Sequence, residues 1–336
     1  MNADSLFAVY YDTFTTFSAT FSTLDYNEDI GRLGDIRCLA CYPMHPKLVL
    51  ERWQLEPKKS LGQNFLCDEN VLAHIAAAAE LELGDNVLEI GPGLGGLTQH
   101  LARAAGRVVA VELDDRLIPI LHKELDGRTN VEVVHGDILA HDPATWFDNA
   151  PYKVVANVPY YITGAILRHL LGSRHKPALM VLTVQQEVAE RLTARPGQMS
   201  LLAVSVQFYG RPVIVGRIKA GAFWPSPAVD SAVVRIDCRG GPAVQVDDEE
   251  AFFAIVRAGF SQKRKQLKNN LANQRVALQA AEVELALARA GVDGRRRAET
   301  LSLAEWAAVY RSLMQPTALV GDAHQSGVAR PPLNVI

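Results

Sequence analysis

The glycine-rich segment Glu89-Ile90-Gly91-Pro92-Gly93-Leu94-Gly95-Gly96 is the strongest indication of the fold in this chain. It follows the apolar run Asn86–Ile90, which predicts a buried strand, and it precedes the helical run Leu97–Ala105. Glycines at this place let the backbone turn tightly and approach a ligand that a Cβ atom would exclude. The stretch therefore predicts a ligand-binding turn between a strand and a helix.

The alternation of short apolar runs with helical stretches continues beyond this turn. It predicts a doubly wound α/β sheet of the Rossmann-like kind, with a ligand crevice at the carboxyl ends of the strands. The last two runs have no helix between them, which favours an antiparallel pair at the end of the sheet. The further strand candidates are Val108–Val111, Val131–Val134, Lys153–Ala156, Ala178–Thr183, Val213–Ile218 and Ser231–Ile236. Ahead of the sheet, Asp68 can cap a helix with Val71, Leu72, Ile75, Ala79 and Leu83 on one face.

The strand pattern stops after Gly240-Gly241-Pro242. We expect a sheet domain over residues 44–241 and a small all-α domain over residues 247–314, whose helices are Glu249–Phe260, Val283–Ala290 and Ser302–Leu313. Residues 315–336 have no period and predict a disordered tail. Residues 1–43 differ in composition from the rest and stay unassigned, either as a lineage-specific extension or as sequence upstream of a start at Met44.

Composition excludes several classes of protein. The 336 residues have 49% hydrophobic content and a net charge of −3, and no apolar run approaches the ~20 residues of a membrane span. The N-terminus has neither a secretory signal nor the Arg-rich, acid-poor character of a mitochondrial presequence, so we expect a cytoplasmic protein. Cys38 and Cys41 form a C-x-x-C without a second pair of ligands, so we expect no metal site.

Acidic residues at the next two strand ends indicate what the crevice binds. Gly91, Gly93 and Gly96 match G-x-G-x-x-G, and Glu112 stands where a carboxylate can accept hydrogen bonds from ribose hydroxyls. Sites for NAD and for S-adenosylmethionine share both features. Asp137, at the end of the third strand, can accept a hydrogen bond from an adenine amino group, although a loop-capping aspartate would look the same.

The fourth strand ends in Asn157-Val158-Pro159-Tyr160, the most specific local motif of the chain. An N6 amine of adenine is a poor nucleophile because its lone pair is delocalised into the ring. The Asn157 side-chain carbonyl and a backbone carbonyl made rigid by Pro159 can accept both N6 hydrogens and favour a pyramidal nitrogen. Tyr160 offers a face on which an extruded adenine can stack, worth about 1–3 kcal/mol.

A second aromatic wall is expected from Phe223, in the segment Ala222–Ser231 that leads into the last strand. Two prolines make that segment extended. An aromatic residue before prolines is more often a packing residue, and the stacking role is favoured here because it would complete the site around Tyr160.

Five motifs together resemble the small-subunit ribosomal RNA adenine dimethyltransferases, the KsgA family. The resemblance runs from about residue 47 to residue 314. It is carried by Lys59-Ser60-Leu61-Gly62-Gln63-Asn64-Phe65-Leu66, the Glu89–Gly96 loop, Asn157–Tyr160 with Phe223–Ser231, and Phe260–Leu271. It implies a Rossmann-like S-adenosylmethionine-dependent methyltransferase domain followed by a small helical domain. It also implies that two adjacent adenosines, in a hairpin loop near the 3′ end of 16S rRNA, each receive two methyl groups during small-subunit biogenesis.

The resemblance assigns roles to single residues. Asn64 and Leu66 would contact the methionine part of S-adenosylmethionine, with Gly91 beneath it. Glu112 would hold the ribose and Asp137 the adenine. Asn157 would lie between the cofactor and the target amine. The implied partner is 16S rRNA within a small-subunit precursor, bound by a monomer.

Basic residues form two clusters, and the second of them lies in a stretch, from Ala251 to Ala281, that contains no acidic residue. A charge run is most often a solvated helix face, but beside an adenine pocket such clusters are typical of phosphate contacts. The expected RNA contacts are Lys59 in the first cluster (Lys47, Arg52, Lys58, Lys59) and Arg257, Lys263, Arg264, Lys265 and Lys268 in the second, which also holds Arg275.

Three alternatives stay open from the sequence. A macrolide-resistance enzyme that dimethylates 23S rRNA would share the catalytic motifs, and only Phe260–Leu271 argues against it. An NAD(P)-dependent oxidoreductase would use the glycine loop, but Asn157–Tyr160 would then have no function. A non-catalytic role in ribosome assembly would depend on docking more than on methylation.

Overall fold

The computed structural model describes residues 45–273 and 279–315. The expected extension of residues 1–43, Met44, Cys38 and Cys41, Arg275 and the tail from residue 316 onward lie outside the described residues. None of the helices in the described ranges combines the length and the hydrophobicity of a membrane-spanning segment.

Seven strands of the described chain form one sheet in the order β4-β3-β2-β5-β6-β9-β7. The first five of this order are parallel, and β9 is antiparallel to both β6 and β7. Each expected strand is therefore confirmed, as is the antiparallel pair at the end of the sheet. The strands are β2 (Asn86–Ile90), β3 (Arg107–Glu112), β4 (Val131–His135), β5 (Tyr152–Asn157), β6 (Leu179–Gln185), β7 (Arg211–Ile218) and β9 (Ser231–Asp237).

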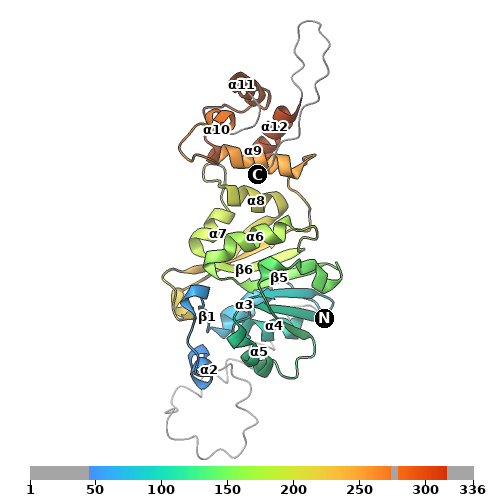
Figure 1. Cartoon of the computed structure of the whole chain (residues 1–336), viewed down its shortest axis with the longest axis vertical. Helices are drawn as coiled ribbons and strands as arrows, with labels where there is room; N and C mark the ends of the chain where they lie inside the picture. The colour runs from blue at the N-terminus through green and yellow to red at the C-terminus, as the bar shows by residue number, and fades with distance from the viewer. Residues whose placement is uncertain (1–44, 274–278, 316–336) are drawn as a thin grey trace, which may run out of the picture. The chain divides into compact units, whose positions relative to one another are not determined.

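Helices cover both faces of this sheet, as a doubly wound fold requires. One face packs into an apolar cluster with α3 and α4, and the other face packs with α6, α7 and α8. Figure 1 shows these helices around β5 and β6. The helices of this part are α2 (Pro46–Arg52), α3 (Glu69–Ala78), α4 (Gly96–Ala104), α5 (Ile118–Glu124), α6 (Thr163–Gly172), α7 (Gln186–Leu192) and α8 (Leu201–Tyr209).

Helix α3 begins as the sequence predicts and ends earlier. The Asp68 carboxylate accepts hydrogen bonds from the backbone N–H groups of Asn70 and Val71, so it caps the helix. The expectation that Leu83 lies on the buried face is wrong, because α3 ends at Ala78 and Leu83 is 80% exposed. Glu80 has a φ of 47°, and this left-handed conformation stops the helix before Leu83.

A second, two-stranded sheet joins distant parts of the chain. Strand β1 (Phe65–Leu66) pairs antiparallel with β8 (Phe223–Trp224). Leu66 and Phe223 face each other in this ladder and both belong to the apolar cluster that contains α3. The pairing holds the segment before α3 against the loop before β9.

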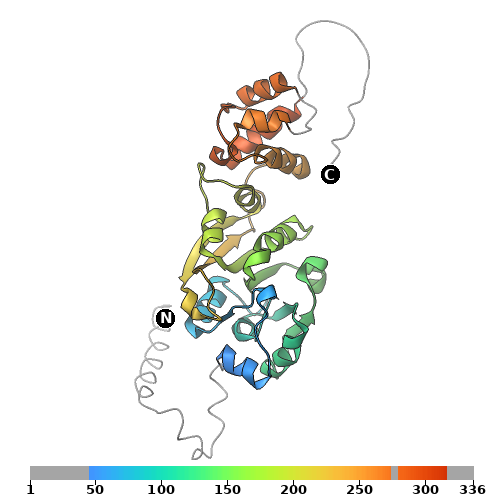
Figure 2. The same ribbon diagram turned by 60° about the vertical axis from the view of Figure 1, so that its left-hand side comes forward.

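The C-terminal helices pack around an apolar cluster that includes α8 as well. Phe208 of α8 stacks on Phe252, and Trp306 is fully buried in the same cluster. Figure 2 shows the orange and red helices grouped together. They are α9 (Glu249–Gly259), α10 (Leu267–Asn273), α11 (Ala280–Arg289) and α12 (Leu303–Met314). The expected boundary at 241–247 falls in the connection between β9 and α9, and the domain limits themselves stay a prediction.

Candidate active site

Four parallel strands bring the expected site residues to one edge of the sheet. Strands β4, β3, β2 and β5 are consecutive neighbours, and parallel strands end at the same edge. Asp137, Glu112, Gly91 and Asn157 each lie at or just after the carboxyl end of one of them. Residues up to 66 positions apart in sequence thus come together at one edge of the sheet, the place of the crevice in which doubly wound folds bind ligands.

The glycine loop approaches the turn after β5. Gly91 has a φ of 67°, and its N–H donates to the Val111 carbonyl at 2.9 Å. A Cβ atom placed on Gly91 would lie 3.9 Å from Cδ of Pro159. Only a methyl-sized group on Gly91 would thus reach Pro159, so Gly91 lies close to the Asn157–Tyr160 turn.

Glu112 is a buried carboxylate held by backbone donors. Its Oε2 accepts from the N–H of Gly93 at 3.0 Å and its Oε1 from the N–H of Asp114 at 2.8 Å. Burial raises the pKa of Glu112, and these backbone hydrogen bonds act in the opposite direction. A carboxylate oxygen has two lone pairs, so each oxygen retains acceptor capacity for a ligand hydroxyl.

Asp137 caps the turn after β4, and this does not exclude the adenine-binding role that the sequence also left open. Its Oδ1 accepts from the N–H of Leu139 at 2.9 Å and so caps the turn Ile138–Ala140. The side chain is exposed at the strand end. Capping uses one carboxylate oxygen and leaves the other as an acceptor.

The segment before α3 lies along both loops of the crevice. A Cβ atom on Gly62 would lie 3.3 Å from the ring of Tyr161, and one on Gly93 would lie 3.2 Å from the ring of Phe65. Between them, the Asn64 carbonyl accepts a hydrogen bond from Nδ2 of Asn157 at 3.3 Å. The structure thus brings Asn64 and Asn157 into contact, whereas the Leu66 side chain is buried in the β1–β8 packing.

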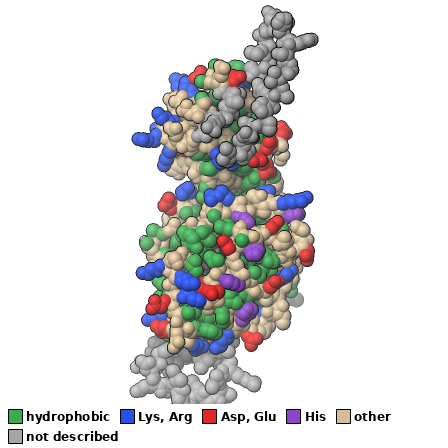
Figure 3. Space-filling view, in the orientation of Figure 1, with side chains coloured by type: hydrophobic (Ala, Val, Ile, Leu, Met, Phe, Trp, Pro, Cys, Tyr) green, Lys and Arg blue, Asp and Glu red, His purple; other side chains and the backbone are tan. Residues whose placement is uncertain are grey.

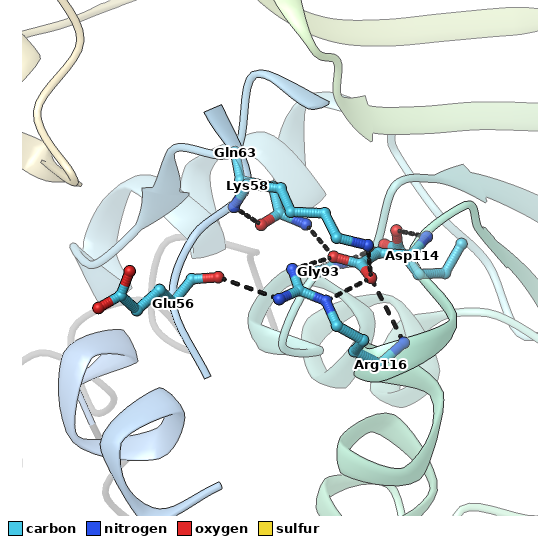
Figure 4. A network of polar contacts seen from close by, with 7 residues as sticks. Glu56, Lys58, Gln63, Gly93, Asp114 and Arg116 are labelled. Carbon is cyan, nitrogen blue, oxygen red and sulfur yellow. Dashed lines mark hydrogen bonds and ion pairs between the residues drawn. The ribbon is translucent and has the colours of Figure 1, made fainter. Parts of the chain in front are cut away.

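Asp114 fastens this segment to the strand end that carries Glu112 (Figure 4). Its buried carboxylate accepts from Nζ of Lys58 at 2.9 Å, from Nε2 of Gln63 at 2.8 Å and from the Arg116 guanidinium at 2.7 and 2.9 Å. These partners hold the pKa of Asp114 well below its usual range, with the Arg116 hydrogen bonds the largest cause. The sequence offered Lys58 only as part of an RNA-contacting cluster, but the structure places it in this network.

Tyr160 and Phe223 have different surroundings. The Tyr160 ring is half-buried, and its hydroxyl lies 2.6 Å from Oγ of Ser231. Phe223 is 3% exposed and packs with Leu66 and Ile75. The expectation that Phe223 presents a stacking face is not met in this conformation, because the ring is part of the apolar core.

Comparison with known proteins places this geometry in a family. The sequence model described as ribosomal RNA adenine dimethylase matches residues 54–315. The chain belongs to the ribosomal RNA adenine dimethylase family. It is 48% identical over 270 residues to the ribosomal RNA small subunit methyltransferase A of Moorella thermoacetica, covering 77% of this chain and 93% of that protein. To the protein of the same name from Dehalococcoides mccartyi it is 46% identical over 261 residues, covering 77% and 89%.

Solved structures agree with this assignment. The 23S rRNA methyltransferase ErmE is 32% identical, with a TM-score of 0.62 over 75% of this chain and 100% of that one. A dimethyladenosine transferase from Plasmodium falciparum has the same fold, with 24% identity, a TM-score of 0.60 and coverage of 73% and 95%.

An adenine dimethylase of this family has to bind RNA. The basic side chains expected to do so differ in their exposure and in whether they already form a salt bridge. Arg257, Lys263, Arg264 and Lys265 are exposed and form no salt bridge with any described residue. Figure 3 shows Lys and Arg side chains on the surface of the helical part. Lys268 is half-buried and pairs with Glu284 at 2.7 Å, so it is already neutralised. In the first cluster Lys59 is exposed and lines a cavity of about 530 Å³ together with Asn64 and Trp224.

Proposed function

We propose that this chain uses S-adenosylmethionine to dimethylate the N6 amines of two adjacent adenosines in a hairpin loop near the 3′ end of 16S rRNA. The observation that carries the proposal is the approach of the Gly91 floor to the Asn157–Tyr160 turn, within 3.9 Å of a Cβ position. A methyl donor above Gly91 and an adenine beside Tyr160 would then be neighbours. Methyl transfer needs that proximity, which is worth several kcal/mol of activation free energy.

The crevice suits S-adenosylmethionine by its donors, acceptors and shape. Gly91 and Gly93 both have positive φ values, a conformation that favours glycine. Because neither residue has a side chain, none occupies the space beside the loop. Glu112 would accept from the ribose hydroxyls and the free oxygen of Asp137 from the adenine amine. Asn64 would contact the methionine part, with Leu66 acting through its main chain. When bound, the cofactor supplies an electrophilic methyl group on a positively charged sulfur.

The amine would be held by two acceptors at the end of β5. Nδ2 of Asn157 is committed to the Asn64 carbonyl, which leaves Oδ1 as the acceptor for one N6 hydrogen. The Val158 carbonyl, immediately before Pro159, accepts no hydrogen bond from the residues that the structure describes. It can take the second hydrogen. Both bonds strengthen as the nitrogen becomes pyramidal, so they favour the transition state over the ground state.

The choice between 16S and 23S rRNA as the substrate depends on the relatives. The relatives with 46–48% identity are named for the small ribosomal subunit, whereas the 23S enzyme ErmE is 32% identical. We therefore propose 16S rRNA in a small-subunit precursor as the substrate, bound by a monomer. Exposed Lys59, Arg257, Lys263, Arg264 and Lys265 would contact phosphates without reading the sequence.

Radiolabelled methyl transfer tests the proposal. Purified full-length protein is incubated with S-adenosylmethionine and either small-subunit precursors that lack the modification or protein-free 23S rRNA. Mass spectrometry of the RNA then locates the product. We expect N6,N6-dimethyladenosine at two adjacent positions of 16S rRNA. Methylation confined to 23S rRNA, or tight NADH binding without binding of S-adenosylmethionine, would contradict the proposal.

A further inference from the structure

The Tyr160 ring is fixed at both of its ends. At the main-chain end, Tyr160 follows Pro159 and begins the turn Tyr160–Ile162, and the Thr163 hydroxyl bonds to the Tyr160 carbonyl at 3.2 Å. At the far end the phenol hydroxyl lies 2.6 Å from Oγ of Ser231. A tyrosine ring without the second link could rotate about its side-chain bonds, but here both ends are tied.

Ser231 is a rigid anchor for that second link. It is the first residue of β9 and is 0% exposed, with Gln185 of β6 and Ile218 of β7 as its neighbours in the sheet. The preceding residue, Asp230, accepts hydrogen bonds from the N–H of Ala220 at 3.0 Å and from Nζ of Lys219 at 2.8 Å. Strands on both sides and a fixed loop therefore hold the serine in place.

A buried hydroxyl at this position needs a partner. Ser231 is followed by the buried residues Ala232, Val233 and Val234, and an unpaired hydroxyl among apolar groups costs about 1–3 kcal/mol. Apart from Tyr160, no described side chain forms a hydrogen bond with Oγ of Ser231. Packing alone could be satisfied by alanine, so a serine here is accounted for by the phenol of Tyr160.

We propose that Ser231 is a positioning residue that fixes the plane of the Tyr160 ring so that the extruded adenine meets a preformed stacking face. The inference rests on the proposed function, since it requires an adenine on Tyr160. Ser231 itself touches neither adenine nor cofactor. Because a fixed platform lowers the entropic cost of orienting the base, its loss should slow methyl transfer at an unchanged affinity for the methyl donor.

A double-mutant cycle on the full-length protein tests the link. Ser231→Ala, Tyr160→Phe and the double variant are compared for methyl transfer to small-subunit precursors and for binding of S-adenosylmethionine. Each single variant removes the same hydrogen bond from a different side and keeps the aromatic ring. We expect each to lower kcat/KM about tenfold, as one hydrogen bond allows, and the double variant to be no slower than either single one. The inference would be overturned if the reductions in kcat/KM of the two single variants multiplied in the double variant. It would also be overturned if the Ser231→Ala enzyme were as fast as the native one.

A spectroscopic readout separates positioning from a general loss of stability. The adenine analogue 2-aminopurine, placed at a target position of the small-subunit hairpin RNA, reports stacking through its fluorescence lifetime. With the native enzyme we expect one dominant short lifetime, and with Ser231→Ala a spread of lifetimes at equal RNA binding. An unchanged lifetime distribution would overturn the inference. If native protein fails to methylate 16S rRNA, the proposed function itself fails, and this outcome is distinct from a native enzyme that works and a Ser231→Ala variant that matches it.

Discussion

Nδ2 of Asn157 donates a hydrogen bond to the main-chain carbonyl of Asn64 across 3.3 Å. The two residues come from the end of β5 and from the segment before β1, so the bond closes one side of the crevice. It also sets the orientation of the Asn157 amide, because the nitrogen is used and the oxygen is left for a ligand. The position of the Asn64 segment and the orientation of the Asn157 amide therefore depend on the same hydrogen bond.

Replacing Asn157 by alanine should separate methylation from binding. The variant loses the Oδ1 acceptor, and a misplaced amine costs about 100-fold in rate. We expect single-turnover methyl transfer to fall by about that factor or more, while binding of small-subunit precursors stays within about threefold of the native value. Methyl transfer at the native rate would exclude the proposed role of Asn157.

Replacing Gly93 by alanine should weaken cofactor binding more than its backbone strain alone predicts. The residue has a φ of 61°, and the new Cβ would meet the Phe65 ring at 3.2 Å. Gly127→Ala is a matched control, since its φ is 78° and nothing lies within 4 Å of its Cβ. Both variants should lose about 1–2 kcal/mol of stability. Only Gly93→Ala should reduce S-adenosylmethionine affinity in calorimetry, and equal affinities would argue against the contact with Phe65.

Replacing Asp114 by asparagine should release the segment that carries Lys58 and Gln63. The neutral side chain keeps the size of the carboxylate but loses the charge that pairs with Lys58 and Arg116. We expect the affinity for S-adenosylmethionine to fall about tenfold, which corresponds to ~1.4 kcal/mol. Protease cleavage near residues 57–63 should become faster. Native affinity in the variant would show that the network does not support the cofactor site.

Stability should decline between pH 5 and pH 8 because of Glu89. This carboxyl is buried at the end of β2, and burial raises its pKa to about 8. The pKa of Glu89 is higher in the native than in the unfolded state. Its contribution to the free energy of unfolding is therefore fully present below pH ~4.5 and is lost as the pH rises toward 8. Glu89→Gln is neutral at every pH, so its unfolding free energy should fall less over this window. Urea unfolding of the native protein and of Glu89→Gln across this pH range measures both free energies. If the two free energies of unfolding changed in parallel with pH, this prediction would be contradicted.

The two basic residues Arg264 and Lys268 should differ in RNA binding. Arg264 is exposed with no described ionic partner, whereas Lys268 pairs with Glu284. Arg264→Ala should lower the slope of log K against log salt by about one unit, as for one lost phosphate contact. Lys268→Ala should change the slope by less. Filter binding of small-subunit precursors across a salt series measures both, and a larger effect of Lys268→Ala would reverse the assignment.

The regular elements of the fold follow from local patterns in the sequence. Apolar runs predicted every strand of the seven-stranded sheet, since each run is short and stands apart from its neighbours in the sequence. The Asp68 cap was equally readable, because it involves neighbouring residues. The early end of α3 was not, because nothing in the pattern requires Glu80 to take a left-handed conformation.

Parts of the site that depend on distant pairs could not be predicted. Strands β1 and β8 have two residues each, too few to show a period. Asp114 lies two residues after Glu112 in the sequence. Its pairing with Lys58 and Gln63 could not be predicted, because these residues are more than 50 positions away. The same limit explains Phe223, whose burial depends on Leu66, and Lys268, whose charge is neutralised by Glu284.

The ladder between β1 and β8 sets an order of events for the nascent chain. Residues 65–66 leave the ribosome early, yet they have no partner until residues 223–224 have been synthesised. Until then the segment that carries Asn64 cannot be fastened over the crevice on that side. A growing polypeptide can thus complete this side of the sheet edge only after most of its length exists.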